Sequence, residues 1–136
     1  MPRKGMSWAY SPPKPPKPKV SESVKQGVAE KANALVETVL KPQHIKPPPD
    51  DERFNYLVDI STKWFRSYFY FCTTYRCPGN ATVPSFEDRF ARLEYRSPDR
   101  FNLSFMRHTG QWIEIYPDIS LDECLVAIRD DPFFLP

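Results

Sequence analysis

The residue types that could carry chemistry are few in this chain. The two histidines, His44 and His108, stand in an expected linker and an expected turn. Cys72 and Cys77 follow C-x4-C spacing instead of the C-x2-C spacing of a zinc ribbon, and no second pair exists. The sequence therefore predicts no metal site and no cofactor. We expect reduced cysteines that act as small apolar residues.

Patterns for catalysis are also missing from the sequence. It contains no glycine-rich phosphate loop and no nucleophile elbow. Glu87 and Asp88 are adjacent in an expected strand, so their carboxylates face opposite ways. Arg107, His108 and Glu114 surround one expected hairpin, but a histidine in a turn is ordinarily a solvated turn residue. We therefore expect a protein that is not an enzyme.

The pattern that favours a function is an aromatic run between residues 63 and 76. Interpreted as one strand over 63–75, it places on a core face Phe65, Ser67, Phe69, Phe71, Thr73 and Tyr75. The other face would carry Trp64, Arg66, Tyr68, Tyr70, Cys72, Thr74 and Arg76. Later strands are expected to add to that second face Asn102, Ser104, Met106, Trp112, Glu114 and Tyr116. Flat rings interleaved with guanidinium groups can stack unpaired bases while arginine contacts phosphate.

The amino terminus adds charge of one sign. Residues 1–20 hold five bases, no acid and six of the sixteen prolines, whereas residues 51–136 hold ten bases and thirteen acids. Such a tail should be polyproline-II-like or unfolded by itself, and it favours a polyanion or an acidic protein surface as partner. The plain alternative is a solubilising tail. Trp8 and Tyr10 would anchor the tail either to a partner or back onto the body of the protein, and the sequence leaves both open.

Helix and strand signals predict the elements that position these residues. Ser23 with Gln26 fits a capping box, with Ser21 as an alternative N-cap, for a helix that ends at Pro42. Its apolar face would be Val24, Val28, Ala32, Leu35 and Val39. Strands are expected at 54–60, 63–75, 86–95, 101–107 and 111–116, where Pro117-Asp118 closes the last one. Ser120 and Glu123 form a second capping box, for a helix that ends by Asp131.

This order predicts an α+β fold: an N-terminal helix, a five-stranded antiparallel meander sheet and a C-terminal helix, preceded by a Pro/Lys-rich extended tail. The expected division is a basic proline-rich tail over residues 1–20, a helix with a proline-rich linker over 21–50, and an α+β domain over 51–136. No stretch approaches the roughly 18 apolar residues of a membrane span. The basic start is not followed by an apolar region, as in a signal peptide, so we expect a cytoplasmic protein.

Three stretches carry a resemblance to a known family. They are Ala91-Arg92-Leu93-Glu94-Tyr95, the run from Asn102 to Trp112, and Ser120-Leu121-Asp122-Glu123 before the acidic, phenylalanine-rich end. Together they resemble an uncharacterised bacterial family, the domain of unknown function 3024, over residues 40–136. The resemblance implies a small bacterial α+β domain and no particular activity, and it leaves the tail outside.

The expected function is that of a non-enzymatic accessory protein that binds nucleic acid, RNA more than DNA, or a ribonucleoprotein assembly. The alternatives are a protein-interaction subunit whose tail docks an acidic partner, and an aromatic face buried by the chain itself or in a homodimer. The tail residues expected to bind nucleic acid are Arg3, Lys4, Lys14, Lys17 and Lys19. Those of the sheet are Trp64, Arg66, Tyr68, Tyr70, Arg76, Asn102 and Trp112.

Overall fold

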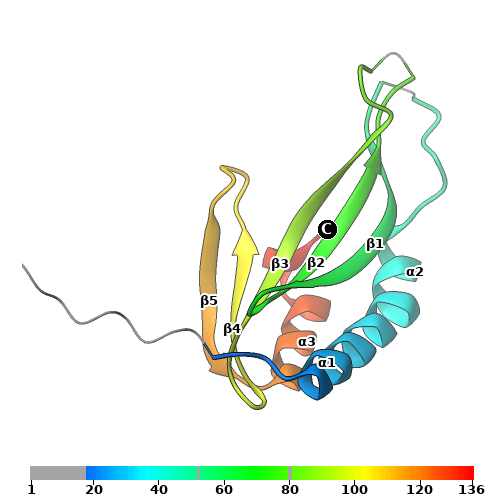
Figure 1. Ribbon diagram of the computed structural model, residues 1–136. Helices are drawn as coiled ribbons and strands as arrows, with labels where there is room; N and C mark the ends of the chain where they lie inside the picture. Colours follow the sequence, from blue (N-terminus) through cyan, green and yellow to red (C-terminus); the bar gives the residue numbers. More distant parts are fainter. Residues whose placement is uncertain (1–17, 52, 80) are drawn as a thin grey trace, which may run out of the picture.

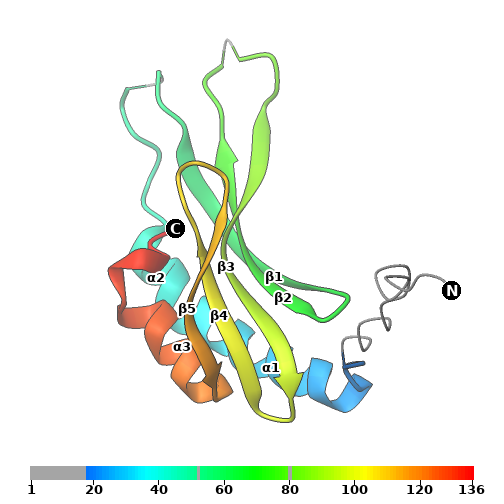
Figure 2. The ribbon, with the colours of Figure 1, turned by 90° about the vertical axis from the view of Figure 1, so that its left-hand side faces the viewer.

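The protein is an α+β domain, as the element order predicts. The computed structural model describes residues 18–51, 53–79 and 81–136. The five strands form one antiparallel sheet in the order β1-β2-β3-β4-β5. Helices α1 (Glu22–Leu35) and α3 (Leu121–Asp130) lie together on one face of that sheet (Figures 1 and 2). No helix or strand of the described chain lies over the opposite face, which we call the open face.

The first helix begins two residues earlier than the Ser23 capping box predicts. Its N-cap is the alternative, Ser21, whose hydroxyl accepts a hydrogen bond from the Val24 N–H at 3.3 Å. The helix also does not end at Pro42. It continues through a π-helical segment, η2 (Val36–Leu40), into α2 (Lys41–His44). Proline cannot donate to the helix and its ring clashes with the carbonyl four residues before, so the wider π turn just ahead of it lets the chain remain helical.

The π segment also changes which residues the helix buries. The buried stripe is Val28, Ala32, Val36 and Leu40, at a constant spacing of four. The predicted stripe ended on Leu35 and Val39, and both are only half-buried. A wider turn advances more slowly around the axis, so a spacing of four stays on one side. The stripe packs on the sheet, in the same core as Phe69, Leu93 and Leu103.

The long strand predicted over 63–75 is wrong, because the chain folds back in its middle. Strand β1 is Tyr56–Phe65 and strand β2 is Tyr68–Arg76, and the two pair directly from Phe65 and Tyr68 outward. The two-residue turn between them holds Arg66 at a φ of 57°. Two-residue hairpins require this left-handed conformation, which glycine, asparagine or aspartate normally supplies. Arg66-Ser67 carries none of them.

The remaining strands agree more closely with the expected ranges. Strand β3 is Ser85–Ser97 and strand β4 is Arg100–Met106. Strand β5 is Trp112–Ile119, so Pro117 does not close it. Proline is tolerated there because β5 is an edge strand, where its missing N–H costs no hydrogen bond with a neighbour. The Ser120 and Glu123 capping box is formed as predicted, and α3 ends before a short 3-10 turn, η3 (Pro132–Phe134).

Candidate functional site

The open face is built from residues that pair directly across the strands. One row crosses all five strands: Lys63, Tyr70, Arg92, Ser104 and Glu114. A second row crosses the first four: Phe65, Tyr68, Glu94 and Asn102. Met106 pairs with Trp112 at the edge. Because directly paired residues point to the same side of a sheet, these side chains share one surface.

Arg92 lies at the centre of this surface. The carbon of its guanidinium group is 4.7 Å from the centroid of the Tyr68 ring and 4.8 Å from that of the Trp112 ring. Contacts of this kind attract a cation to the face of a ring and hold the planar group in one orientation. The buried Nε atom of Arg92 has no hydrogen-bond partner among the described residues. Among the described residues, the Arg92 guanidinium is therefore held by aromatic rings and forms no ion pair with a carboxylate.

A second arginine repeats the arrangement. Arg89 lies over the Tyr70 ring with its guanidinium carbon 4.4 Å from the centroid. The Tyr70 ring is 6.1 Å from the Tyr68 ring and 5.8 Å from the Trp112 ring, so the three rings form a continuous row. Within the described part of the chain, neither Arg89 nor Arg92 forms an ion pair. Two oriented cations without an acidic partner on the described residues favour an anionic ligand.

Asn102 lies on the open face as predicted, but its side chain is already used within the fold. Its Nδ2 donates to Glu94 Oε1 at 3.3 Å, and its Oδ1 accepts the Asp118 N–H at 2.9 Å. Asp118 has a φ of 51° and lies where β5 departs from regular pairing with β4. Both polar groups of the Asn102 side chain are therefore used to hold the edge strand.

Trp64 and Tyr116 do not lie on the open face, so both predictions are wrong. They belong to the row under the helices: Trp64, Phe69, Leu93, Leu103 and Tyr116. The Trp64 Nε1–H donates to the Lys25 carbonyl of α1 at 3.0 Å. Tyr116 donates its hydroxyl to Asp131 at 2.5 Å, which raises the pKa of the Tyr116 phenol.

Both errors have a structural cause. The turn at Arg66-Ser67 exchanges the faces of Trp64 and Phe65, so Phe65 is 55% exposed instead of buried in the core. In β5, Ile115 is an extra residue in the pairing with β4, which moves Tyr116 to the opposite side.

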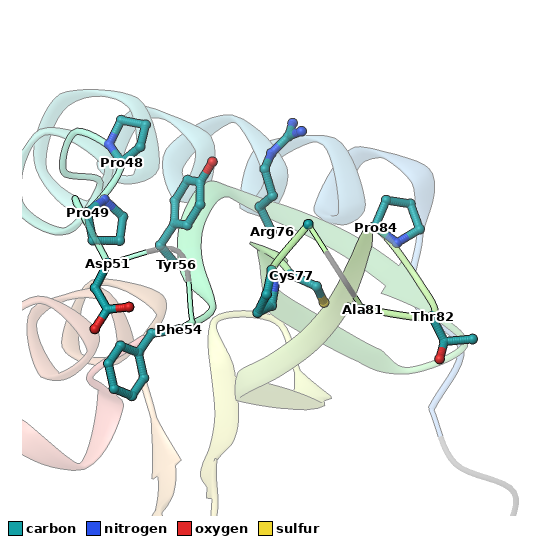
Figure 3. A pocket seen from close by; sticks show the side chains of 12 residues that line it. Pro48, Pro49, Asp51, Phe54, Tyr56, Arg76, Cys77, Ala81, Thr82 and Pro84 are labelled. Atoms are coloured by element: carbon teal, nitrogen blue, oxygen red, sulfur yellow. The ribbon is translucent and has the colours of Figure 1, made fainter.

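Arg76 lies away from the ring row, and Arg66 lies beside Tyr68, the first ring of the row, without a cation–π contact to any of the three rings among the described residues. Arg66 is exposed in the β1–β2 turn, where it contacts the Phe65 ring at 5.2 Å. Arg76 is six residues from Tyr70 along β2, which is about 20 Å of strand. It lines a hollow of about 450 Å³ between the proline-rich linker and the β2–β3 loop (Figure 3). The structure does not bring this arginine to the candidate site.

Of the tail residues predicted to bind nucleic acid, the structure describes only Lys19. Lys19 is exposed, whereas Val20 is buried at 5% exposure and belongs to the hydrophobic core. Lys19 lines a hollow together with Arg66, Ser67 and Tyr68. Arg3, Lys4, Trp8, Tyr10, Lys14 and Lys17 lie outside the described residues.

Arg89 and Arg92 are the functional candidates that the sequence analysis missed. They are three residues apart, so strict alternation assigns them to opposite faces. Phe90 is an extra residue in the pairing of β3 with β2: Ala91 pairs with Phe71, and Arg89 with Cys72. This bulge brings both arginines to one side. The adjacent apolar pair Phe90-Ala91 breaks the alternation and was the available signal.

The residues with metal-binding or nucleophilic potential do not gather at this surface. The described residues contain no cluster of three or more His, Cys, Asp or Glu side chains. Cys72 and Cys124 are buried, and burial raises the pKa of both thiols, that of Cys124 to about 12. Burial lowers the pKa of His44, with a smaller contribution from Lys46. His108 is exposed in the β4–β5 turn.

No helix in the described ranges is long and apolar enough to cross a membrane.

Comparison with known proteins places the chain in a family. No curated protein and no solved structure matches the chain. The family model of the domain of unknown function (DUF3024) matches residues 7–136. The match begins well before residue 40, so it includes Trp8, Tyr10 and the proline run. The chain therefore belongs to the DUF3024 family.

Proposed function

We propose that this protein is a non-enzymatic accessory protein that binds single-stranded nucleic acid through its open face and its basic tail. The observation that supports the proposal is the stacking of Arg89 and Arg92 on the rings of Tyr70, Tyr68 and Trp112. In this arrangement the guanidinium groups are oriented before any ligand arrives, so little side-chain entropy is lost when a phosphate binds.

The ring row supplies the second half of the interaction. Tyr68 and Trp112 are half-buried, and we propose that their uncovered ring surface stacks bases, while Tyr70 is only 6% exposed and supports its two neighbours. Stacking of a base on an aromatic side chain contributes about 1–3 kcal/mol and tolerates any sequence. RNA is favoured over DNA because single strands stacked on a sheet are a common mode of RNA recognition. A ribonucleoprotein assembly would offer such strands.

Fluorescence anisotropy of a labelled oligouridine tests the proposal. We compare the full chain with the double variant Arg89→Gln/Arg92→Gln. The matched control is Arg53→Gln/Arg100→Gln, which removes the same charge from two exposed arginines outside the ring row. The test variant should bind at least about tenfold more weakly, which corresponds to about 1.4 kcal/mol. Its slope of log K against log salt should be shallower by about 1.4, because each phosphate contact contributes about 0.7.

Two outcomes contradict the proposal. If both double variants weaken binding equally, net charge and not the open face governs the interaction. If the full chain binds neither RNA nor DNA at low salt, the protein-interaction alternative, with an acidic protein as partner of the tail, replaces this proposal.

A further inference from the structure

A groove of about 680 Å³ lies between helix α3 and the edge strand β5 (Figure 2). We call it the α3–β5 groove. Its apolar lining residues are Tyr116, Ile119, Val126, Ala127 and Pro132. Val126 is 48% exposed, although its side chain is aliphatic. A single exposed valine is ordinary, but within an apolar groove it adds to a surface that another molecule can cover.

The charges that line this groove have one sign. All the charged residues that line it are acids: Asp122, Glu123, Asp130 and Asp131. Two of these acids are used within the fold, since Glu123 completes the capping box of α3 and Asp131 accepts the hydroxyl hydrogen of Tyr116. An apolar surface surrounded by carboxylates complements a ligand that is both apolar and positively charged.

The other two acids are exposed at the surface of α3. Asp122 contacts Lys31 at 3.4 Å, and Asp130 contacts Arg129 at 2.8 Å. Ion pairs between exposed side chains contribute little to stability, because water screens them and both side chains lose freedom in forming them. A cation from a ligand can therefore replace either partner at small cost.

The spacing along α3 adds a length to this charge pattern. Asp122, Val126 and Asp130 repeat every four residues, so they follow one another along one side of the helix. At 1.5 Å per residue the two carboxylates are separated by about 12 Å, with Val126 halfway between them. In an extended peptide, residues i, i+2 and i+4 face one way and span about 13 Å. The pattern base-x-apolar-x-base therefore matches the groove in charge, polarity and length.

We propose that the α3–β5 groove binds an extended segment of a partner protein in which two lysines or arginines flank an aliphatic residue, in the order base-x-apolar-x-base. The aliphatic side chain packs against Val126, and the two bases pair with Asp122 and Asp130. This contact does not depend on the proposed function. The groove belongs to the helix side of the sheet, and its carboxylates repel the phosphates that the open face is proposed to bind.

Fluorescence anisotropy with two synthetic peptides tests the proposal on the full chain. The probe is fluorescein-labelled Gly-Lys-Ser-Leu-Ser-Lys-Gly with blocked ends. The matched peptide is Gly-Lys-Lys-Ser-Leu-Ser-Gly, which has the same composition and charge but adjacent bases. Because only the first peptide can reach both carboxylates while its leucine covers Val126, we expect it to bind at least about fivefold more tightly.

Variants of the groove locate the binding site. Asp122→Asn/Asp130→Asn should weaken binding of the first peptide by about fivefold, and Val126→Ser by about threefold. All three positions are exposed, so these changes leave the core intact. The matched control is Glu30→Gln/Asp50→Asn, which removes the same charge from two exposed acids outside the groove and should leave binding unchanged.

Three results would overturn the proposal. Equal affinity for the two peptides, or an equal loss in the two double variants, would mean that net charge alone attracts the bases. A gain in peptide affinity on deletion of residues 1–17 would identify the chain's own basic tail as the occupant of the groove, in place of a partner. Absence of binding up to about 1 mM peptide would mean that the groove does not accept such a segment.

Discussion

Two neighbouring residues of β2 separate the core face of the sheet from the open face. Phe69 is 1% exposed, and its ring lies 5.1 Å from the Trp64 ring and 5.6 Å from the Phe71 ring. Tyr68 is half-buried on the other side, where it contacts Arg92 and Tyr70. We predict that Phe69→Ala is far more destabilising than Tyr68→Ala.

The expected magnitudes follow from these contacts. Full burial of an aromatic side chain removes about 150–250 Å² from water, or about 4–6 kcal/mol, and measured Phe→Ala changes in cores cost about 3–5 kcal/mol. We expect about 4 kcal/mol for Phe69→Ala. Tyr68→Ala removes one cation–π contact and one ring pair, each worth about 1 kcal/mol, together with the long hydrogen bond that the Tyr68 hydroxyl donates to Glu94 at 3.5 Å. Arg92 retains Trp112, so we expect a cost of about 2 kcal/mol.

Urea unfolding and thermal melts measure both changes. At about 4 °C per kcal/mol for a chain of this size, Phe69→Ala should lower the Tm by about 16 °C and Tyr68→Ala by about half as much. At temperatures where both variants are folded, only Tyr68→Ala should weaken binding of a single strand, by about 1–3 kcal/mol. A third variant, Trp64→Phe, removes the indole N–H whose hydrogen bond the Lys25 carbonyl accepts. It should lower the free energy of unfolding by about 1 kcal/mol and leave single-strand binding unchanged.

Equal destabilisation by Tyr68→Ala and Phe69→Ala would refute this assignment of faces. It would mean that Tyr68 is a core residue. The open face would then lose a ring on which the proposed function depends.

Three further predictions follow from other parts of the molecule. Deletion of residues 1–17 removes four bases, Arg3, Lys4, Lys14 and Lys17, but keeps the buried Val20. The slope of log K against log salt for nucleic-acid binding should therefore become shallower by about 2.8. An unchanged slope would mean that these tail residues do not take part in binding. The hydrogen bond from the Ser120 N–H lowers the pKa of Glu123, so its stabilising contribution is complete above the ordinary pKa of about 4.3 and is lost as the pH falls through the lower folded value. Urea midpoints should therefore fall less with acid in Glu123→Gln than in the native chain, and parallel curves would argue against this contribution. Iodoacetamide should modify the half-buried Cys77 in the folded protein and reach the buried Cys72 and Cys124 only after unfolding, whereas equal rates at all three would contradict their burial.

Local signals determined much of the fold from the sequence. The Ser120 and Glu123 capping box depends on atoms three residues apart, so it forms as predicted whatever surrounds it. The four-residue spacing of Val28 and Ala32, and the alternation of Phe101, Leu103 and Phe105, likewise identified a helix and a strand with their buried sides. The same alternation placed Tyr68, Tyr70, Asn102 and Trp112 on one face.

Only the tertiary structure decided where the alternation changes sides. The turn at Arg66 has no glycine or asparagine, and the extra residues Phe90 and Ile115 leave no local mark beyond an adjacent apolar pair. A bulge exists only relative to the neighbouring strand, because it is one residue more on one side of a pairing than on the other. Since a shift of one residue moves every later side chain to the other face, Trp64 and Tyr116 are under the helices. For the same reason Arg89 and Arg92 meet on the open face, where only the pairing of β2 with β3 could bring them.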